Sequence, residues 1–443
     1  MKKVFLYVLL VALVAGLIFG GCAKSTPPTS GPQEILLGAV EPLTGNLATF
    51  GQDGTFGVQA AVDDINGQGG VFVKEYNRKL PVKLIVIDDQ SDTTKAATLA
   101  ESLVLQDKVH FLIGGTIAPP EFAGIATVAD KYRIPFISHE GPFEPYTAMR
   151  ATASPPWQYT WALGFHIGAP FAPGDFRYNV PGYSVIDVMS AVLKQVADQT
   201  NKRTAVFASD EPDGRGWYAS MPAGLKGMGL DVFGADKELG LAPPNTTDFS
   251  AIIKQWKDYN CELLIGNSLS PWFGTLWRQS REMGFKPKFV YAGRASNFYT
   301  DIKAWGGDLA WGVGCETTWD TTIKGVKGIG NTTPVTLNDR YMKGTGNPFS
   351  MLVGLGYYAA QVLFDSIERA GTLDKDKVNE ALAQTDMMTI YSRVVFDENH
   401  FSGGPVAYAQ WFKVNTPAIL EQRVVMSLVD FWPTADKVIF PIP

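Results

Sequence analysis

The chain has 443 residues, of which 46% are hydrophobic and 19% are charged. These values are ordinary for a folded globular protein, and the length allows two domains of typical size. The net charge is -6 and the chain contains no run of basic residues, so the sequence disfavours a nucleic acid as a partner.

Residues 1–22 are typical of a targeting segment. A Lys-Lys pair precedes an unbroken apolar stretch over residues 4–19, and two glycines stand directly before Cys22. This arrangement resembles a bacterial lipoprotein signal, in which the cysteine becomes the lipidated first residue, although Phe19 replaces the usual aliphatic residue. The alternative is an uncleaved transmembrane anchor, because the stretch is nearly long enough to span a bilayer. Either reading places the rest of the chain outside the cytoplasmic membrane, after a flexible tether over residues 23–33.

The remaining cysteines and the histidines predict neither a metal site nor a cofactor. Cys261 and Cys315 either form a pair or lie buried as small hydrophobic residues. The four histidines are scattered, and no Cys-x-x-Cys or His-x-x-x-His spacing brings two metal ligands together.

After the tether, strand and helix patterns alternate. Strands are expected over residues 35–40, 82–87, 111–113 and 134–137, and helices over residues 54–66, 94–106 and 121–133. Residues 110–142 read as a βαβ unit, whose two strands must be parallel. The loops that follow these strands, residues 114–119 and 138–142, therefore emerge side by side at the sheet edge where α/β proteins bind ligands.

A second, similar set of patterns follows. Its strands are expected over residues 204–208, 231–234, 262–266, 288–292 and 311–316, and its helices over residues 216–228, 249–259 and 271–283. Two such sets in one chain predict an α/β fold of two lobes, and a cleft between lobes is a preferred place for a small ligand.

Several segments, in this order, carry a resemblance to a known family. ILLGAVEPLTG at residues 35–45, FGQDG at 50–54, IN at 65–66 and DDQSD at 88–92 resemble the opening of the branched-chain amino-acid binding proteins, the type I periplasmic solute receptors of ABC importers. The likeness continues through VHFLI at residues 109–113, YRIPFIS at 132–138, DGRG at 213–216, TDFS at 247–250, RQSREMGF at 278–285 and FDEN at 396–399. It therefore spans nearly all of the chain after the tether.

The resemblance implies two Rossmann-like lobes that are joined by three crossings and close on the ligand as a hinge. We expect the crossings near residues 151–153, 319–322 and 393–404. The final strand patterns, over residues 407–414 and 422–429, then belong to the second lobe. The expected division is a signal peptide over residues 1–22, a tether over 23–33, a first lobe over 34–152 and 322–393, and a second lobe over 153–320 and 394–443.

The resemblance also implies where a ligand binds. In that family, backbone amides and small hydroxyls on two loops hold the ligand carboxylate, and an aromatic residue lines the ligand side chain. The residues at the matching positions are Phe50, Thr116, Ile117, Ala118, Ser138, His139, Glu140 and Gly141. Successive N–H groups near helix N-termini suit an anion. For Phe50, the alternative is a purely structural place in the core.

The second-lobe positions depart from the family pattern. Asp213 stands where the family commonly has a tyrosine, and Leu269 or Ser270 stands where another is expected. Arg294 falls at or beside the place of the acidic residue that holds the ligand ammonium. An arginine there repels an ammonium but can pair with a carboxylate, unless it is a solvated charge at the rim. Either Asp213 or Glu140 then holds an ammonium, or the ligand lacks an amine.

Residues 152–201 are longer than the matching family segment and are rich in aromatic residues and proline. This insertion is either a hydrophobic flap over the cleft or a surface segment packed on one lobe. A flap of this kind makes an aromatic carboxylate a candidate ligand.

The sequence therefore predicts an extracytoplasmic, lipid-anchored receptor that delivers an amino acid or related small carboxylate to an ABC permease. It does not predict an enzyme, because it contains no nucleophile elbow, P-loop or dinucleotide-binding motif. The alternative function is a ligand-sensing ectodomain that signals through a membrane partner.

Overall fold

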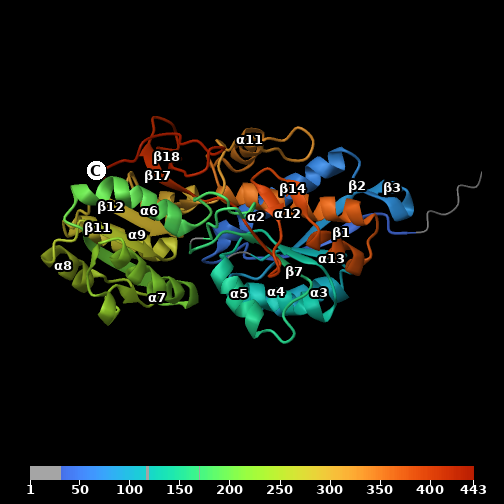
Figure 1. Ribbon diagram of the computed structural model, residues 1–443, viewed down its shortest axis with the longest axis horizontal. Coiled ribbons are helices and arrows are strands. Elements are labelled where there is room, and N and C mark those ends of the chain that lie inside the picture. Colours follow the sequence, from blue (N-terminus) through green and yellow to red (C-terminus); the bar gives the residue numbers. More distant parts are fainter. Residues whose placement is uncertain (1–30, 116–118, 169) are drawn as a thin grey trace, which may run out of the picture.

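The computed structural model describes residues 31–115, 119–168 and 170–443. These residues form two α/β lobes side by side, with the middle of the chain in one lobe and most of the N-terminal third in the other (Figure 1). The predicted two-lobe α/β fold is confirmed. The sequence prediction for Thr116, Ile117 and Ala118 lies outside the described residues.

The first lobe is built on a six-stranded parallel sheet. Its strands, in spatial order, are β16 (Phe401–Gly403), β7 (Thr160–Gly164), β6 (Phe136–Ser138), β5 (Phe111–Gly114), β1 (Ile35–Glu41) and β4 (Val82–Asp88). The predicted βαβ unit is present, because β5 and β6 pair in parallel through Leu112–Phe136 and Ile113–Ile137. The carboxyl ends of these strands therefore lie along one edge of the sheet.

Helices cover both faces of this sheet. α2 (Ala48–Gly67), α11 (Pro334–Thr345), α12 (Met351–Ala370) and α13 (Lys375–Ala383) share a core with one face, and α3 (Ala96–Leu105), α4 (Pro119–Lys131) and α5 (Phe143–Thr152) share a core with the other. Successive residues of β5 point to opposite faces: Phe111 and Ile113 join the first core and Leu112 joins the second. This burial on both sides explains why the strands read as continuous apolar runs.

α2 and α12 cross unusually closely. A Cβ atom at Gly57 would lie 2.1 Å from the carbonyl oxygen of Val353, and one at Gly356 would lie 2.1 Å from the carbonyl oxygen of Gly54. Only glycine fits at these two positions, so the two helices form a rigid pair behind the cleft.

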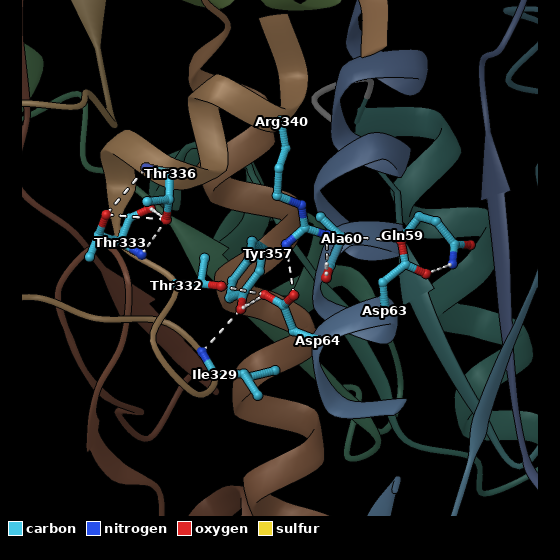
Figure 2. Close-up of polar contacts among 10 residues, drawn as sticks. All are labelled: Gln59, Ala60, Asp63, Asp64, Ile329, Thr332, Thr333, Thr336, Arg340 and Tyr357. Carbon is cyan, nitrogen blue, oxygen red and sulfur yellow. Dashed lines mark hydrogen bonds and ion pairs between the residues drawn. The ribbon is translucent and has the colours of Figure 1, made fainter. Parts of the chain in front are cut away.

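A polar cluster fastens α11 and the loop before it to this pair (Figure 2). Asp64 of α2 accepts hydrogen bonds from the hydroxyls of Thr332 and Tyr357, both at 2.6 Å, and from Nη1 of Arg340 at 2.7 Å. Tyr357 also accepts a bond from the amide of Ile329 at 3.0 Å. One carboxylate thus joins three segments that are far apart in the sequence.

The second lobe is built on a mixed sheet. Its strands, in spatial order, are β10 (Leu241–Ala242), β8 (Arg203–Ser209), β11 (Leu263–Asn267), β12 (Phe289–Gly293), β13 (Gly314–Thr317), β17 (Ala407–Lys413) and β18 (Leu420–Met426), and β9 (Asp231–Val232) pairs with β8. The strands from β10 to β13 are parallel, whereas β17 and β18 add antiparallel pairs at one side.

Helices again cover both faces. α8 (Ser250–Asp258), α9 (Ser270–Glu282) and α10 (Tyr299–Trp305) share one core with the sheet, and α6 (Val185–Val196) and α7 (Pro212–Gly227) share the other. The short remaining elements are the pairs β2 (Val71–Val73) with β3 (Arg78–Leu80) and β14 (Asp386–Met388) with β15 (Arg393–Val395), and the 3-10 turns Lys74–Tyr76, Ala197–Gln199 and Ala235–Lys237.

The expected crossing near residues 151–153 lies later in the chain than predicted, and the one near residues 393–404 lies at the end of its expected range. β7 follows residues 151–153 but pairs with β6 in the first sheet, so the first crossing lies between Gly164 and Val185. β16 also belongs to the first sheet, through its pairing with β7, so the last crossing lies between Gly403 and Ala407. Residues 153–164 and 394–403 therefore belong to the first lobe, because their backbone hydrogen bonds complete its sheet.

The aromatic insertion over residues 152–201 is neither only a flap over the cleft nor only a surface segment packed on one lobe. Trp157, Tyr159 and Trp161 are buried in the first lobe, whereas α6 packs in the second lobe. Phe171 and Phe176 are 38% and 58% exposed. The insertion therefore carries the first crossing and contributes to both lobes.

The two cysteines of the folded part, Cys261 and Cys315, are buried and do not form a disulfide. Within the described ranges, no helix combines the length and apolarity that crossing a bilayer requires. The same part of the chain contains no cluster of His, Cys, Asp and Glu side chains arranged to hold a metal ion.

Candidate functional site

A cavity of about 60 Å³ lies between the two lobes. Its walls combine first-lobe residues, residues of the insertion and second-lobe residues: Phe50, Glu140, Pro142, Phe165, Ile167, Val185, Asp213, Trp217, Asn267, Tyr291, Gly293, Arg294, Asn297, Glu316 and Met351. A wider groove of about 620 Å³ adjoins it and shares Ile167, Asp213, Trp217 and Asn267. This groove runs between α5 and α7, which face each other across the two lobes in Figure 1.

The parallel sheets bring the polar lining residues together. Glu140 follows β6 of the first sheet, Asn267 ends β11, and Arg294 directly follows β12. Glu316 lies within β13, one residue before the strand ends. The carboxyl ends of both sheets thus point toward the cleft, as expected for ligand sites of α/β proteins.

Arg294 is held by two carboxylates of its own lobe. Its Nη2 forms an ion pair with Glu211, and its Nη1 lies 3.1 Å from Oδ2 of Asp213. Asn267 also donates to Oδ2 of Asp213, at 2.8 Å. Arg294 adopts a left-handed backbone conformation with φ of 60°. The guanidinium is therefore a bound part of the cleft wall and not a solvated charge at the rim.

Glu211 also fixes the start of α7. Its carboxylate accepts hydrogen bonds from the amides of Asp213 and Gly214, at 3.0 and 3.1 Å, which caps the helix. The same carboxylate pairs with Arg294. The position of Asp213 in the cleft is thus determined by a helix cap and an ion pair together.

Glu316 is the next acidic member of the wall. Its carboxylate accepts hydrogen bonds from the hydroxyl of Tyr291 and, at 3.3 Å, from the amide of Arg294. Burial raises the pKa of Glu316 in spite of these bonds.

Glu140 lies in the first-lobe wall and is only 2% exposed. Its Oε2 has no hydrogen-bond partner among the residues that the structure describes. Burial, and secondarily the charge of Glu316, raise the pKa of Glu140 to about 8. The cleft therefore contains a buried carboxyl group that is mostly protonated at neutral pH and whose Oε2 lacks a partner among the described residues.

The remaining wall is apolar. Phe50, at the start of α2, packs edge-to-face on Phe298 of the second lobe, with ring centroids 4.6 Å apart. Trp217 of α7 and Ile167 of the insertion lie where the cavity meets the groove. The insertion thus supplies part of the cleft wall.

The structure brings together four of the residues that the sequence marked: Phe50, Glu140, Asp213 and Arg294 all line the cavity. Ser138, His139 and Gly141 lie beside or beneath it. Ser138 and Gly141 line a neighbouring cavity of about 20 Å³, and His139 is fully buried with Nε2 3.0 Å from Oε1 of Glu41.

Leu269 and Ser270 do not line the cavity. α9 begins at Ser270, and the Ser270 hydroxyl accepts a hydrogen bond from Nε1 of Trp305 at 3.0 Å. This position therefore belongs to the packing between α9 and α10, and Asn267 is the β11 residue that reaches the cleft.

Sequence reasoning missed Asn267, Tyr291, Asn297, Glu316 and Met351 of the cavity wall. Glu316 had a usable signal, because it is a charged residue at the end of an apolar strand pattern that runs toward the cleft edge. Met351 begins the buried helix α12 and gave no such signal.

Comparison with known proteins agrees with this architecture. The model of the family "Periplasmic binding protein" matches residues 34–415. An "Amino acid binding protein" of Pseudomonas aeruginosa is 25% identical over 271 residues, which are 58% of this chain and 60% of that protein. A "Leu/Ile/Val/Thr-binding protein" of Salmonella typhimurium is 23% identical over 62% of this chain and 66% of that protein. The matched segments thus span less than two thirds of these relatives.

Solved structures share the fold. The branched-chain amino acid transporter substrate binding protein LivJ of Streptococcus pneumoniae, in complex with isoleucine, has a TM-score of 0.66 at 18% identity, over 89% of this chain and 99% of that one. A solute binding protein of an ABC transporter from Rhodopseudomonas palustris, in complex with 3,4-dihydroxy benzoic acid, has a TM-score of 0.65 at 16% identity, over 91% and 99% of the two chains.

The family match covers most of the chain, and the two-lobe fold and the interlobe cavity agree with it. The chain belongs to the family of periplasmic binding proteins, whose members are non-enzymatic ligand receptors.

Proposed function

We propose that this protein is the extracytoplasmic solute-binding receptor of an ABC importer and captures an amino acid or related small carboxylate between its lobes. One observation supports this most strongly: charged side chains from both lobes, Glu140 from the first and Asp213, Arg294 and Glu316 from the second, line one interlobe cavity. A solute that touches both sets favours the arrangement in which the lobes are close.

The proposed ligand is small. The inner cavity measures about 60 Å³ and holds the charged groups, whereas the adjoining groove of about 620 Å³ has Trp217, Ile167 and Met221 among its apolar lining residues. We expect the polar head of the ligand to occupy the inner cavity and its apolar side chain to extend into the groove. This side chain can be aliphatic or aromatic.

Ligand-induced thermal stabilisation tests this proposal. A ligand that binds only the folded protein raises its apparent stability. We expect a shift in melting temperature with at least one member of a panel of amino acids and organic acids. An identical melting temperature across the whole panel contradicts the proposal.

The partner is proposed to be an ABC permease. A pull-down from membranes with the full-length protein, with and without its ligand, should enrich a permease and its ATPase. Enrichment of a sensor kinase in their place contradicts the importer role and supports a ligand-sensing ectodomain.

The proposed anchor is a lipid on Cys22. We expect labelled palmitate to be incorporated into the wild-type protein and not into Cys22→Ala. Label retained by the variant contradicts the anchor.

A further inference from the structure

We propose that the cleft recognises its ligand through a protonated amine held between Glu140 of the first lobe and Glu316 of the second. This inference rests on the proposed function and narrows its ligand class. It predicts that amino acids and small primary amines bind and that acids without an amine do not.

The charges around the cavity support a cationic ligand group. Three acidic residues line the cavity, Glu140, Asp213 and Glu316, and a fourth, Glu211, pairs with the one basic residue there, Arg294. Arg294 already forms ion pairs with Glu211 and Asp213, so its charge is taken up within the second lobe. Arg294 also interacts electrostatically with Glu316, so three acidic residues share this one positive charge, and no basic residue of the described cavity wall is left for Glu140.

The carboxyl groups of Glu316 and Glu140 differ in their hydrogen-bond partners. Glu316 accepts bonds from the Tyr291 hydroxyl and the Arg294 amide, which orient it without neutralising it. Oε2 of Glu140 has no hydrogen-bond partner in the described ranges, although the side chain is almost fully buried. A buried, unpartnered carboxylate in a cavity wall is costly unless a ligand completes it.

The tyrosines near Glu140 do not provide the positive charge that this carboxyl group lacks. Tyr358 of α12 and Tyr391, before β15, are the other titratable groups that Glu140 influences, and burial raises the pKa of both hydroxyls. The Tyr391 hydroxyl donates to the carbonyl of Pro405, and the Tyr358 hydroxyl has no partner among the described side chains and backbone. Neither residue supplies a positive charge.

The carboxylate group of a ligand fits poorly against Glu140 and Glu316. It would approach Glu140 and Glu316, and both terminal nitrogens of Arg294 already pair with Glu211 and Asp213, which leaves only Nε without a partner among the described residues. A protonated amine instead donates up to three hydrogen bonds and reaches carboxylates on both lobes. Contact of one amine with both carboxylates therefore explains both recognition of the ligand and closure of the lobes.

The test compares matched sets of three compounds: an amino acid, the amine left when its carboxylate is removed, and the acid left when its amine is removed. Alanine, ethylamine and propionate form one set; valine, isobutylamine and isovalerate form a second; phenylalanine, phenethylamine and hydrocinnamate form a third. Binding of each compound to the full-length protein in detergent is measured by thermal shift and calorimetry.

We expect amine-bearing members to bind and the corresponding acids to bind more than tenfold more weakly. Glu140→Gln keeps the shape of the side chain and removes its charge, so it should weaken amine binding roughly 10–100-fold. Glu368→Gln, an exposed position on α12, makes the same chemical change outside the cleft and should bind as the wild type does.

The pH dependence gives a second readout that needs no variant. Because an amine binds the ionised form of Glu140, its affinity should rise by up to about tenfold per pH unit between about pH 6 and 8. A protonated Glu140 that donated to a ligand carboxylate would give affinity that falls over this range.

Preferred binding of the amine-free acids, or affinity that falls with rising pH, overturns the inference and leaves the proposed receptor function intact. Unchanged amine affinity in Glu140→Gln also overturns it. If no compound of any set and no member of the wider panel of amino acids and organic acids binds the wild-type protein, the proposed receptor function fails together with the inference.

Discussion

Nη1 of Arg294 lies 3.1 Å from Oδ2 of Asp213, on the same lobe, and the same guanidinium pairs with Glu211. The Arg294 side chain is only 11% exposed, so water screens these ion pairs weakly. Arg294 is therefore part of the structure of the second lobe, whatever it contributes to ligand binding.

We expect Arg294→Ala to lower the free energy of unfolding by about 3 kcal/mol, because it leaves two adjacent carboxylates without a counter-charge. Urea denaturation measures the loss. Adding Asp213→Asn should recover part of it. Unchanged stability combined with lost ligand affinity would contradict this account and assign Arg294 to the ligand.

The two lobes also touch directly beside the cleft. The Thr49 hydroxyl donates to Oδ1 of Asp301 at 3.0 Å, next to the contact between Phe50 and Phe298. Thr49→Val should weaken the interlobe contact by about 1 kcal/mol, because it removes a hydrogen bond to a half-buried charged acceptor. We expect a larger radius of gyration in small-angle scattering of the ligand-free variant.

Thr127→Val is the matched control, because the Thr127 hydroxyl bonds only to the carbonyl of Ala123 within its own helix. An equal radius of gyration for Thr49→Val and the control would show that this contact does not hold the lobes together.

Asp53 makes stability depend on pH. Burial raises its pKa to about 6, and the hydrogen bond from the Tyr341 hydroxyl opposes this shift. The folded protein therefore holds a proton on Asp53 that the unfolded chain releases near pH 4. Stability should consequently fall as the pH rises from about 4 to 6, by up to about 3 kcal/mol from this group.

Asp53→Asn should remove this part of the pH dependence, since the amide oxygen still accepts from the Tyr341 hydroxyl, which is 2.8 Å from Oδ1 of Asp53. Urea denaturation at several pH values measures it, with Asp107→Asn at an exposed position as the control. Identical pH profiles for wild type and Asp53→Asn would contradict the assignment.

The hydrogen bonds around Asp64 in Figure 2 predict a large loss of stability when Asp64 is substituted. Asp64→Ala removes the acceptor of Thr332, Tyr357 and Arg340, and should destabilise the first lobe by about 3 kcal/mol. The neighbouring Asp63 is 58% exposed and lies 3.9 Å from Arg340, so Asp63→Ala should cost less than about 1 kcal/mol. Equal losses for the two variants in urea denaturation would contradict the role of Asp64.

Much of the fold could be predicted because parallel strands buried on both faces read as apolar runs between helix patterns. The expected strand over residues 111–113 matches β5, and the expected helix over residues 121–133 matches α4 within two residues at each end. The start of α2 could not be read from the apolar pattern: it begins at Ala48, before the predicted residue 54, because Phe50 anchors the first turn against the second lobe.

The crossings were harder to predict. β7 is a five-residue strand inside an aromatic, proline-rich segment, and only its pairing with β6 and β16 shows which lobe it belongs to. Pairing between strands that are distant in the sequence leaves little trace in local pattern, which is why the lobe boundaries were placed too early.

The candidate site could be predicted only in part, because strand patterns locate some of its residues and tertiary packing alone locates the others. Loop residues such as Glu140 and Arg294 follow strand patterns directly, so the topology alone brings them to the cleft edge. The partners of Arg294 could not be predicted, because Glu211 reaches it only once α7 and β12 are packed in one lobe.

Calorimetric titration near neutral pH, in two buffers with different ionisation enthalpies, tests the central claim most directly. The titrant is the amino acid that gives the largest melting shift. Because an amine between Glu140 and Glu316 requires an ionised Glu140, whose pKa is about 8 in the empty cleft, binding should release a proton to the buffer. Uptake of a proton, or binding without proton exchange, would contradict recognition of the ligand through its amine.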